Sequence, residues 1–277
     1  MKRLKNFING EFVDSASAEE LEVVYPVTGE TVALAPVSTA DEVDAAMRAA
    51  QEAFKTWKHT TPADRQLMLL KLADALEKNA DALVEAQHRN TGQPREMIRD
   101  EEVLAGANQV RFFAGAARTL EGKAAAEYME GHTSYVRREP VGVVAQVTPW
   151  NYPLMMALWK IGPALAAGNT VVLKPSDTTP ESTLELAKLI ADIFPAGVFN
   201  VVLGTGATGA AMVNHPAPAM VSITGSVRAG RAVATGAAAG LKRSHLELGG
   251  KAPAVVFADA DLSRTARMLA DFGYFNA

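Results

Sequence analysis

The second half of the chain alternates short, wholly apolar runs with segments of helical periodicity. The apolar runs cover residues 141–147, 170–173, 198–203 and 220–224, and the helical segments cover residues 153–167, 180–194, 209–214 and 228–239. Strands that are apolar along their whole length must be covered on both faces, as in a parallel sheet with helices on each side. The pattern therefore predicts an α/β fold with a doubly wound parallel sheet, whose ligands bind beyond the carboxyl ends of the strands.

The first half of the chain predicts a helical layer framed by extended segments. Residues 7–37 alternate apolar residues with turn signals, which predicts short strands at an edge. Three amphipathic helices are predicted next: one after Thr39, one from Thr61-Pro62 toward Gly92, and one from about Pro94 to Gly122. Residues 124–144 become extended again around Gly131, and we expect a hairpin that reaches away from the main body.

Composition excludes several classes of protein. The 277 residues carry a net charge of −4, which argues against a nucleic-acid partner, because binding phosphates requires a concentrated basic face. No segment approaches the ~20 consecutive apolar residues of a membrane span, so we expect no membrane partner. The chain has no cysteine and therefore no disulfide, which fits a reducing compartment, and we expect a cytoplasmic location. The five histidines lack metal-ligand spacing, so no metal site is expected.

The first two apolar runs of the second half end in polar residues. Asn151 follows Thr148-Pro149-Trp150 on a strand-to-helix turn, where its amide can donate to a developing oxyanion. The alternative is a simple turn and cap, which asparagine forms well. Lys174 and Asp177, with Ser176 between them, follow the next run and suit the hydroxyls of a nucleotide ribose. The alternative there is an exposed helix cap.

Two further motifs follow the later strands. Thr224-Gly225-Ser226 lacks the GxGxxG fingerprint, yet a glycine before a helix N-terminus offers backbone N–H groups to a pyrophosphate. Glu247 lies in a largely apolar stretch before Gly249-Gly250, so we expect burial to raise the pKa of this carboxyl toward that of a general base. The alternative is a carboxylate at a strand end that accepts hydrogen bonds from neighbouring N–H groups.

A third candidate is the acidic run Asp100-Glu101-Glu102 on the third predicted helix. It could attract a cationic substrate to the mouth of a channel. Charge runs on helices are, however, usually solvated, and we expect a solvated helix face here in preference to a binding role.

Taken together, four motifs resemble the NAD(P)-dependent aldehyde dehydrogenase superfamily in their order and approximate spacing, and the resemblance covers essentially the whole chain. The motifs are Pro149-Trp150-Asn151-Tyr152-Pro153, Lys174-Pro175-Ser176-Asp177, Thr224-Gly225-Ser226 and Glu247-Leu248-Gly249-Gly250-Lys251. The stretches 112–116 and 150–156 look most like the branch that oxidises amino aldehydes, particularly gamma-aminobutyraldehyde dehydrogenase. The resemblance implies the cofactor NAD and a small aldehyde as substrate.

The resemblance also implies roles for individual residues. Asn151 would donate to the oxyanion, and Glu247 would activate the hydrolytic water. Lys174 and Asp177 would bind the adenosine ribose, and Thr148 and Trp150 would line the cofactor channel. Gly225 and Ser226 would lie by the pyrophosphate and Leu248 near the nicotinamide, and Pro149 and Ser176 would also belong to the cofactor site. Two positions depart from the family pattern. Asp177 is one methylene shorter than the glutamate that is common there, and Val227 replaces a common threonine.

The family reaction requires a cysteine thiolate, which forms a thiohemiacetal and then a thioester. By resemblance, the motif that opens at Phe275-Asn276 would continue to this cysteine beyond Ala277, so we expect the N-terminal portion of a homo-oligomeric parent enzyme and no activity in this portion itself. We expect a cofactor-binding domain at 1–123 and 145–250, an oligomerisation hairpin at 124–144 and the start of a truncated catalytic domain at 251–277. The alternative is a non-catalytic nucleotide-binding or interaction protein derived from the same fold.

Overall fold

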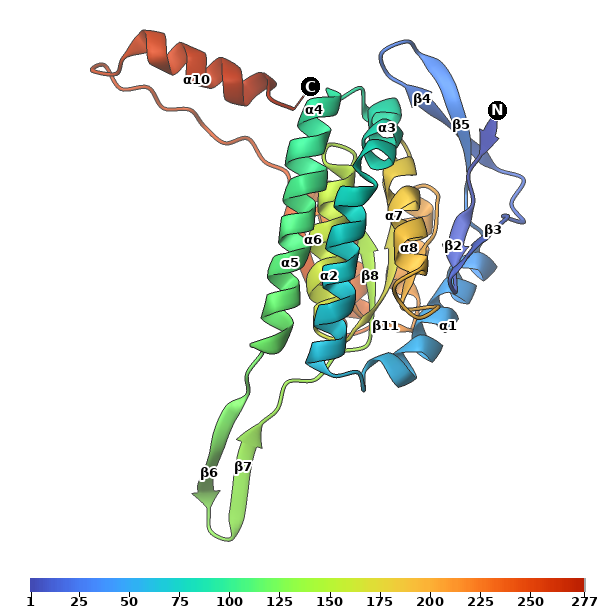
Figure 1. Ribbon diagram of the computed structural model, residues 1–277, viewed down its shortest axis with the longest axis vertical. Coiled ribbons are helices and arrows are strands. Elements are labelled where there is room, and N and C mark those ends of the chain that lie inside the picture. Colours follow the sequence, from blue (N-terminus) through green and yellow to red (C-terminus); the bar gives the residue numbers. More distant parts are fainter. Residues whose placement is uncertain (277) are drawn as a thin grey trace.

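The computed structural model describes residues 1–276, apart from the side chain of residue 124. Within them a seven-stranded sheet has the order β12-β11-β8-β9-β10-β2-β3 (Figure 1). Its strands are β2 (Asn6–Ile8), β3 (Glu11–Val13), β8 (Val143–Val147), β9 (Thr170–Lys174), β10 (Phe199–Val201), β11 (Pro218–Gly225) and β12 (Arg243–Leu248). Strands β8 to β12 are parallel, whereas β2 and β3 are antiparallel and form one edge. The predicted doubly wound α/β fold is confirmed, and of the strands predicted within residues 7–37, β2 and β3 form the edge of this sheet.

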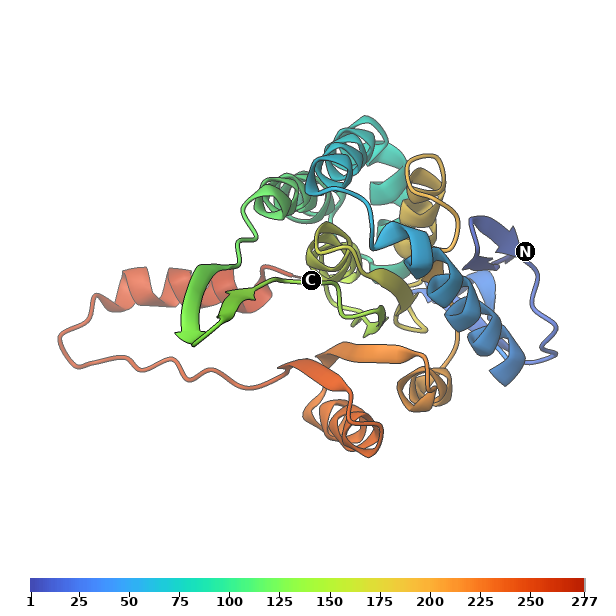
Figure 2. The ribbon, with the colours of Figure 1, turned by 90° about the horizontal axis from the view of Figure 1, so that it is seen from below.

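Helices cover both faces of the sheet, as Figure 2 shows from below. One face packs against α1 (Ala40–Trp57), α8 (Gly206–Asn214) and α9 (Val227–Ala239), and the other against α6 (Pro153–Ala166) and α7 (Glu181–Ala191). Helices α2 (Pro62–Lys78), α3 (Ala80–Thr91) and α5 (Ala105–Arg118) form an outer layer over α6 and α7. Each face of the sheet has its own hydrophobic core. Side chains along β9 alternate between the two faces, so Val171 and Leu173 pack in the core under α6 and α7, and Val172 packs in the core under α1, α8 and α9.

Two predicted helices are interrupted. Asn79 ends α2 and precedes α3, with a non-helical backbone and a side-chain bond from Nδ2 to the Ala75 carbonyl at 2.8 Å. Gly92 ends α3 in the left-handed conformation, where glycine has no Cβ to strain. The third predicted helix contains a short α4 (Arg95–Met97), a π-helical segment η1 (Ile98–Leu104) and then α5, which ends at Arg118, before Gly122.

Three peripheral elements complete the chain. A small sheet combines β1 (Lys2–Arg3), β5 (Glu30–Pro36) and β4 (Glu20–Tyr25). The predicted hairpin is present as β6 (Lys123–Met129) and β7 (His132–Val136), which project from the body in Figure 1. Helix α10 (Leu262–Tyr274) follows a long extended segment and stands away from the sheet in both views, and none of its side chains is buried among the described residues.

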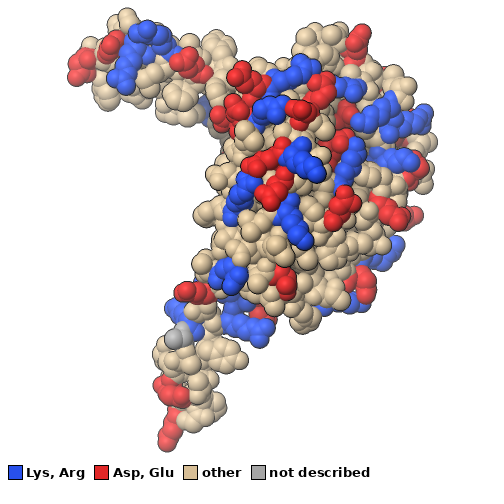
Figure 3. All heavy atoms as spheres, viewed as in Figure 1, with Lys and Arg blue, Asp and Glu red and all other residues tan. Residues whose placement is uncertain are grey.

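The surface of the outer helical layer carries charges of both signs, interspersed across the face seen in Figure 3. Arg111 on α5 is one example, because it bonds Asp74 and Glu77 on α2 and so ties the two helices together. Across residues 1–276, no helix combines the length and apolar character that crossing a membrane requires.

Candidate functional site

The four predicted motifs meet at one edge of the sheet because parallel strands end on the same side. Val147 is in register with Lys174 on β9 and with Ile223 on β11, and Thr224 is in register with Glu247 on β12. The Thr148 N–H donates to the Lys174 carbonyl at 3.1 Å, which joins the first two motifs directly. The register therefore places the four motifs at the same edge of the sheet, beyond the carboxyl ends of these strands, where we predicted the site.

A groove of about 340 Å³ opens at this edge between α8 and α9. We call it the α8–α9 groove; its lining includes Val147, Lys174, Gly209, Arg228, Ala232 and Val233. The lining is mainly apolar, with the cationic side chains Lys174 and Arg228 among it. Apolar walls with a few placed charges are typical of a site for a flat, anionic ligand such as a nucleotide.

Lys174 is held rigidly at the base of this groove. Its Nζ donates to the Pro175 carbonyl at 2.8 Å and to the Gly204 carbonyl at 2.7 Å. An ammonium has three donors, so these bonds leave one for a ligand. Burial lowers the pKa of Lys174 to about 8, an effect that the charge of Asp177 partly opposes. The Lys174 amine therefore begins to lose its proton at slightly alkaline pH.

The second wall of the groove is α9, whose N-terminus carries the glycine motif. Ser226 is its N-cap, and the hydroxyl accepts a hydrogen bond from the Ala229 N–H at 3.1 Å. Gly230 permits close packing of α9 on β12, because a Cβ there would lie 2.4 Å from a methyl carbon of Leu248. The start of a helix offers unpaired N–H groups and the positive end of its dipole to an anion.

Asn151 and Trp150 lie in a separate cavity of about 450 Å³, the Asn151 cavity. Its lining includes Asn90, Gln93, Trp150, Asn151, Thr179 and Asn276. The Asn151 carbonyl accepts hydrogen bonds from Gln93 Nε2 at 3.0 Å and from Asn276 Nδ2 at 2.8 Å. The structure thus brings Asn151 next to Asn276, 125 positions later in the chain, whereas Lys174 lines the α8–α9 groove.

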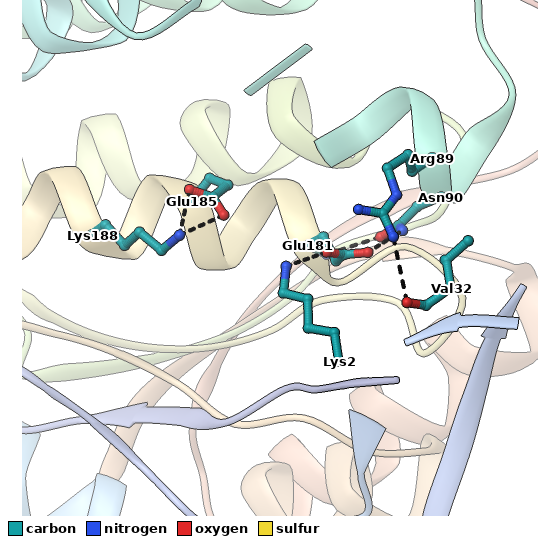
Figure 4. Close-up of polar contacts among 7 residues, drawn as sticks. All are labelled: Lys2, Val32, Arg89, Asn90, Glu181, Glu185 and Lys188. Atoms are coloured by element: carbon teal, nitrogen blue, oxygen red, sulfur yellow. Dashed lines mark hydrogen bonds and ion pairs between the residues drawn. The ribbon is translucent and has the colours of Figure 1, made fainter. Parts of the chain in front are cut away.

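Asn90 ties this cavity to the body through Glu181 (Figure 4). Its Oδ1 accepts from the Glu181 N–H at 2.9 Å, and its Nδ2 donates to Glu181 Oε1 at 3.0 Å. The Glu181 side chain is buried and also forms an ion pair with Lys2 of β1.

We expect Asn90→Ala to lower the free energy of unfolding by about 1–3 kcal/mol, because it leaves buried Glu181 groups without partners. Urea unfolding measures this. The control is Lys188→Ala, which removes the surface Lys188–Glu185 pair on α7, the helix that carries Glu181 (Figure 4). This substitution should change the free energy of unfolding by less than about 0.5 kcal/mol. Equal effects of the two substitutions would contradict the structural role of Asn90.

The remaining predicted cofactor residues differ in exposure. Thr148 is buried, and its hydroxyl oxygen has no hydrogen-bond partner within residues 1–276. Pro149 and Ser176 are half-buried and Asp177 is exposed. The Ser176 hydroxyl donates to Asp177 Oδ1 at 3.2 Å, so the two side chains are coupled at the surface beyond β9.

The expected burial of Glu247 is wrong. Glu247 is exposed on β12, which is the last strand of the sheet and pairs only with β11 among the described residues. An edge strand leaves its outer side open, and the apolar neighbours of Glu247 in the sequence do not enclose it. Its charge still acts on Lys160, whose pKa burial lowers to about 8 while Glu247 opposes the change.

Two sets of residues at or near the site were not predicted from the sequence. Gly206 and Gly209 line the α8–α9 groove, and the signal available for them was a glycine pair after a strand. The acidic run Asp100-Glu101-Glu102 was expected to be solvated. Asp100 and Glu101 are exposed, but Glu102 is fully buried. Burial raises the pKa of Glu102 to about 7, against the lowering effect of the hydrogen bonds that it accepts.

Comparisons with known proteins agree with this arrangement. The sequence profile of the Aldehyde dehydrogenase family matches residues 12–277. An aldehyde dehydrogenase of Alternaria alternata is 42% identical over 275 residues, which are 98% of this chain and 55% of that protein. The chain therefore spans about half the length of this relative.

Two of the solved structures that are similar in fold and sequence contain the dinucleotide NAD. PnpE in complex with nicotinamide adenine dinucleotide has a TM-score of 0.94 at 40% identity, over 99% of this chain and 56% of that one. The NAD+ complex of aldehyde dehydrogenase from Bacillus cereus has a TM-score of 0.91 at 38% identity, over 96% of this chain and 55% of that one. With the strand-end motifs at one edge of a doubly wound sheet and a family profile that spans nearly all of its residues, this chain belongs to the aldehyde dehydrogenase family.

Proposed function

We propose that these residues bind NAD in the α8–α9 groove and form the cofactor-binding part of an NAD-dependent aldehyde dehydrogenase. The observation that carries the proposal is the groove itself, which lies beyond the carboxyl ends of β8, β9 and β11 and has Lys174 and Arg228 in its lining. PnpE and the Bacillus cereus aldehyde dehydrogenase, which are similar to this chain, were solved with this dinucleotide bound.

The residues around the groove fit a dinucleotide. The apolar lining between Val213 and Val233 suits an adenine ring, and the free donor of Lys174 suits a ribose hydroxyl. The α9 N-terminus at Gly225-Ser226 suits a pyrophosphate. Thr148 and Trp150 would continue the site toward Asn151, since both follow β8 at the same edge of the sheet.

NAD, when bound, would supply the hydride acceptor of the reaction. Asn151 would donate its side-chain amide to the oxyanion of the substrate, and Glu247 would take a proton from the hydrolytic water. Leu248 would pack near the nicotinamide. The thiolate of the family reaction is not among these 277 residues, so we expect them to bind NAD without oxidising aldehydes by themselves.

We further propose an amino aldehyde such as 4-aminobutyraldehyde as the substrate of the whole protein, a cytoplasmic location and a homo-oligomeric assembly. In this assignment residues 1–123 and 145–250 form the cofactor domain, residues 124–144 the oligomerisation hairpin, and residues 251–277 the beginning of the catalytic domain. Exposed Tyr128 and Tyr135 on the projecting hairpin support the second assignment, because aromatic side chains are enriched at interfaces.

Isothermal titration of the purified chain with NAD tests the proposal. We expect saturable binding with one site per chain and no NADH formation when 4-aminobutyraldehyde is added. Absence of NAD binding by the folded chain would refute the cofactor assignment. NADH formation would refute the requirement for a thiolate.

We expect Asp177→Ser to shift the preference from NAD toward NADP by about tenfold, or about 1.4 kcal/mol, because a carboxylate repels the extra 2′-phosphate. Asp177 is exposed, so stability should change little. The ratio of the two dissociation constants is the measurement, and Asp192→Ser, at an exposed position after α7, is the matched control. An unchanged ratio would remove Asp177 from the ribose site.

A further inference from the structure

We propose that Glu102 is a positioning residue that orients the turn carrying Asn151, through a buried hydrogen-bond network between η1, α3 and the start of α6. The proposal rests on the role of Asn151 in the proposed function. Glu102 lies far from the strand-end motifs in sequence and lines neither the α8–α9 groove nor the Asn151 cavity. Its side chain is nevertheless completely buried.

The first connection is direct, at the N-terminus of α6. Glu102 Oε2 accepts from the backbone N–H groups of Leu154 and Met155, each at 3.1 Å. The first N–H groups of a helix have no partner within the helix and need one from elsewhere. The N-cap residue Tyr152 supplies no side-chain bond, so Glu102 caps α6 from another element. Its carboxylate also lies at the positive end of the helix dipole.

The second connection passes through two glutamine side chains. Gln87 Nε2 donates to Glu102 Oε1 and also to Gln93 Oε1, the latter at 2.9 Å. Gln93 Nε2 then donates to the Asn151 carbonyl at 3.0 Å. Both ends of the turn, the Asn151 carbonyl and the first N–H groups of α6, are thereby linked to one carboxylate.

The negative charge of Glu102 determines which atoms of Gln87 and Gln93 donate and which accept hydrogen bonds in this network. An ionised carboxylate only accepts hydrogen bonds, so Gln87 must present its amide NH2 to Glu102. The same NH2 meets the oxygen of Gln93, which leaves the NH2 of Gln93 for Asn151. A neutral amide in place of Glu102 can both donate and accept, and it no longer enforces these orientations. Packing alone would not distinguish the two groups, since they have nearly the same shape.

The backbone of η1 brings Glu102 into this position. The π-helical turn lies between α4 and α5, and it buries Glu102 while Asp100 and Glu101 stay exposed. Such π-helical turns are frequent at functional sites. The other titratable groups near the network are Glu101 on η1, Tyr152 at the start of α6, and His88 on α3, whose Nδ1 contacts the Gln93 carbonyl at 2.7 Å.

Nitrogen-15 NMR of the whole chain tests the proposal, with the Asn151 side-chain amide and the Asn151 and Leu154 backbone amides as probes. We expect Glu102→Gln to displace all three signals while the fold is retained. The matched control is Glu101→Gln, the same change at the exposed neighbour, which should leave them in place. Unmoved probes in a folded Glu102→Gln variant would overturn the proposal.

A pH series on the unmodified chain provides a second measurement, which decides the question even if Glu102→Gln does not fold. We expect the three probe signals to titrate together with a midpoint at about pH 7. The titration should persist in His88→Gln, which removes the other titratable side chain attached to Gln93. Probes that do not titrate, or that lose their titration with His88, would refute the role of Glu102.

Addition of NAD to the same samples separates this proposal from the proposed function. Gly209 and Ala232 report on the α8–α9 groove. If NAD shifts the Gly209 and Ala232 signals but Glu102→Gln leaves the Asn151 signals in place, the positioning role of Glu102 is wrong. If Glu102→Gln shifts the Asn151 signals but NAD leaves the Gly209 and Ala232 signals in place, the positioning role stands and the cofactor assignment fails.

Discussion

Replacement of Ala232 by tryptophan is expected to weaken NAD binding by about 100-fold, or about 2.8 kcal/mol. Ala232 lies on α9, is exposed, and lines the α8–α9 groove. A large indole at this position would occupy the space that we assign to the cofactor. Because no buried side chain is disturbed, the fold should remain intact, and circular dichroism checks this.

The matched control for this prediction is Ala238→Trp, the same change at an exposed position of α9 outside the groove. We expect its NAD affinity to stay within about twofold of the unmodified chain, or about 0.4 kcal/mol. Isothermal titration of the three proteins is the measurement. Equal affinities of all three would mean that NAD binds elsewhere on the molecule.

A second large effect is expected in the pH dependence of stability. Burial raises the pKa of Glu102 from 4.5 to about 7, so the folded protein holds this proton more tightly than the unfolded chain. Between these two pH values the folded state therefore binds more protons, and stability must fall as the pH rises. The contribution of Glu102 should decline by about 3 kcal/mol from about pH 4.5 to about pH 7 and stay constant above that.

Urea unfolding of the unmodified chain and of Glu102→Gln across this pH range measures the effect. We expect the variant to lack this decline, so that the difference in unfolding free energy between the two proteins changes by about 3 kcal/mol. Asp64, Glu77 and Glu85, whose pKa values hydrogen bonds lower, act in the opposite direction, and they cancel in this difference. The free energy of unfolding of Glu101→Gln should change with pH in parallel with that of the unmodified chain. A constant difference for Glu102→Gln would contradict the raised pKa.

The parts of the fold that local chemistry decides could be predicted. Thr39 and Thr61 were expected to begin helices, and both form capping boxes in which side chain and backbone bond within three residues. The apolar runs of β8 to β11 were sufficient to predict buried parallel strands, because their period and length exclude a half-exposed strand. Parallel strands in turn placed the motifs around Asn151, Lys174 and Ser226 at one edge.

The errors arose where a residue depends on partners distant in sequence. Apolar neighbours at positions 246 and 248 suggested that Glu247 is buried, but its exposure depends on β12 being an edge strand. Glu102 was assigned to a solvated run because its partners Gln87 and Leu154 lie on other helices. The π-helical turn that buries Glu102 has no simple sequence signature of the kind that caps and turns have.

The sequence by itself therefore determined the sheet, its covering helices and the edge at which the cofactor motifs lie, since these follow from periodicity and from bonds made within a few residues. Only the tertiary structure decided which of those residues share a cavity, how Lys174 is held between two backbone carbonyls, and that Glu102 is buried against the start of α6. Burial and hydrogen bonding between distant segments are collective results of packing, and they set the pKa values and the orientation of the side chains that would carry the chemistry.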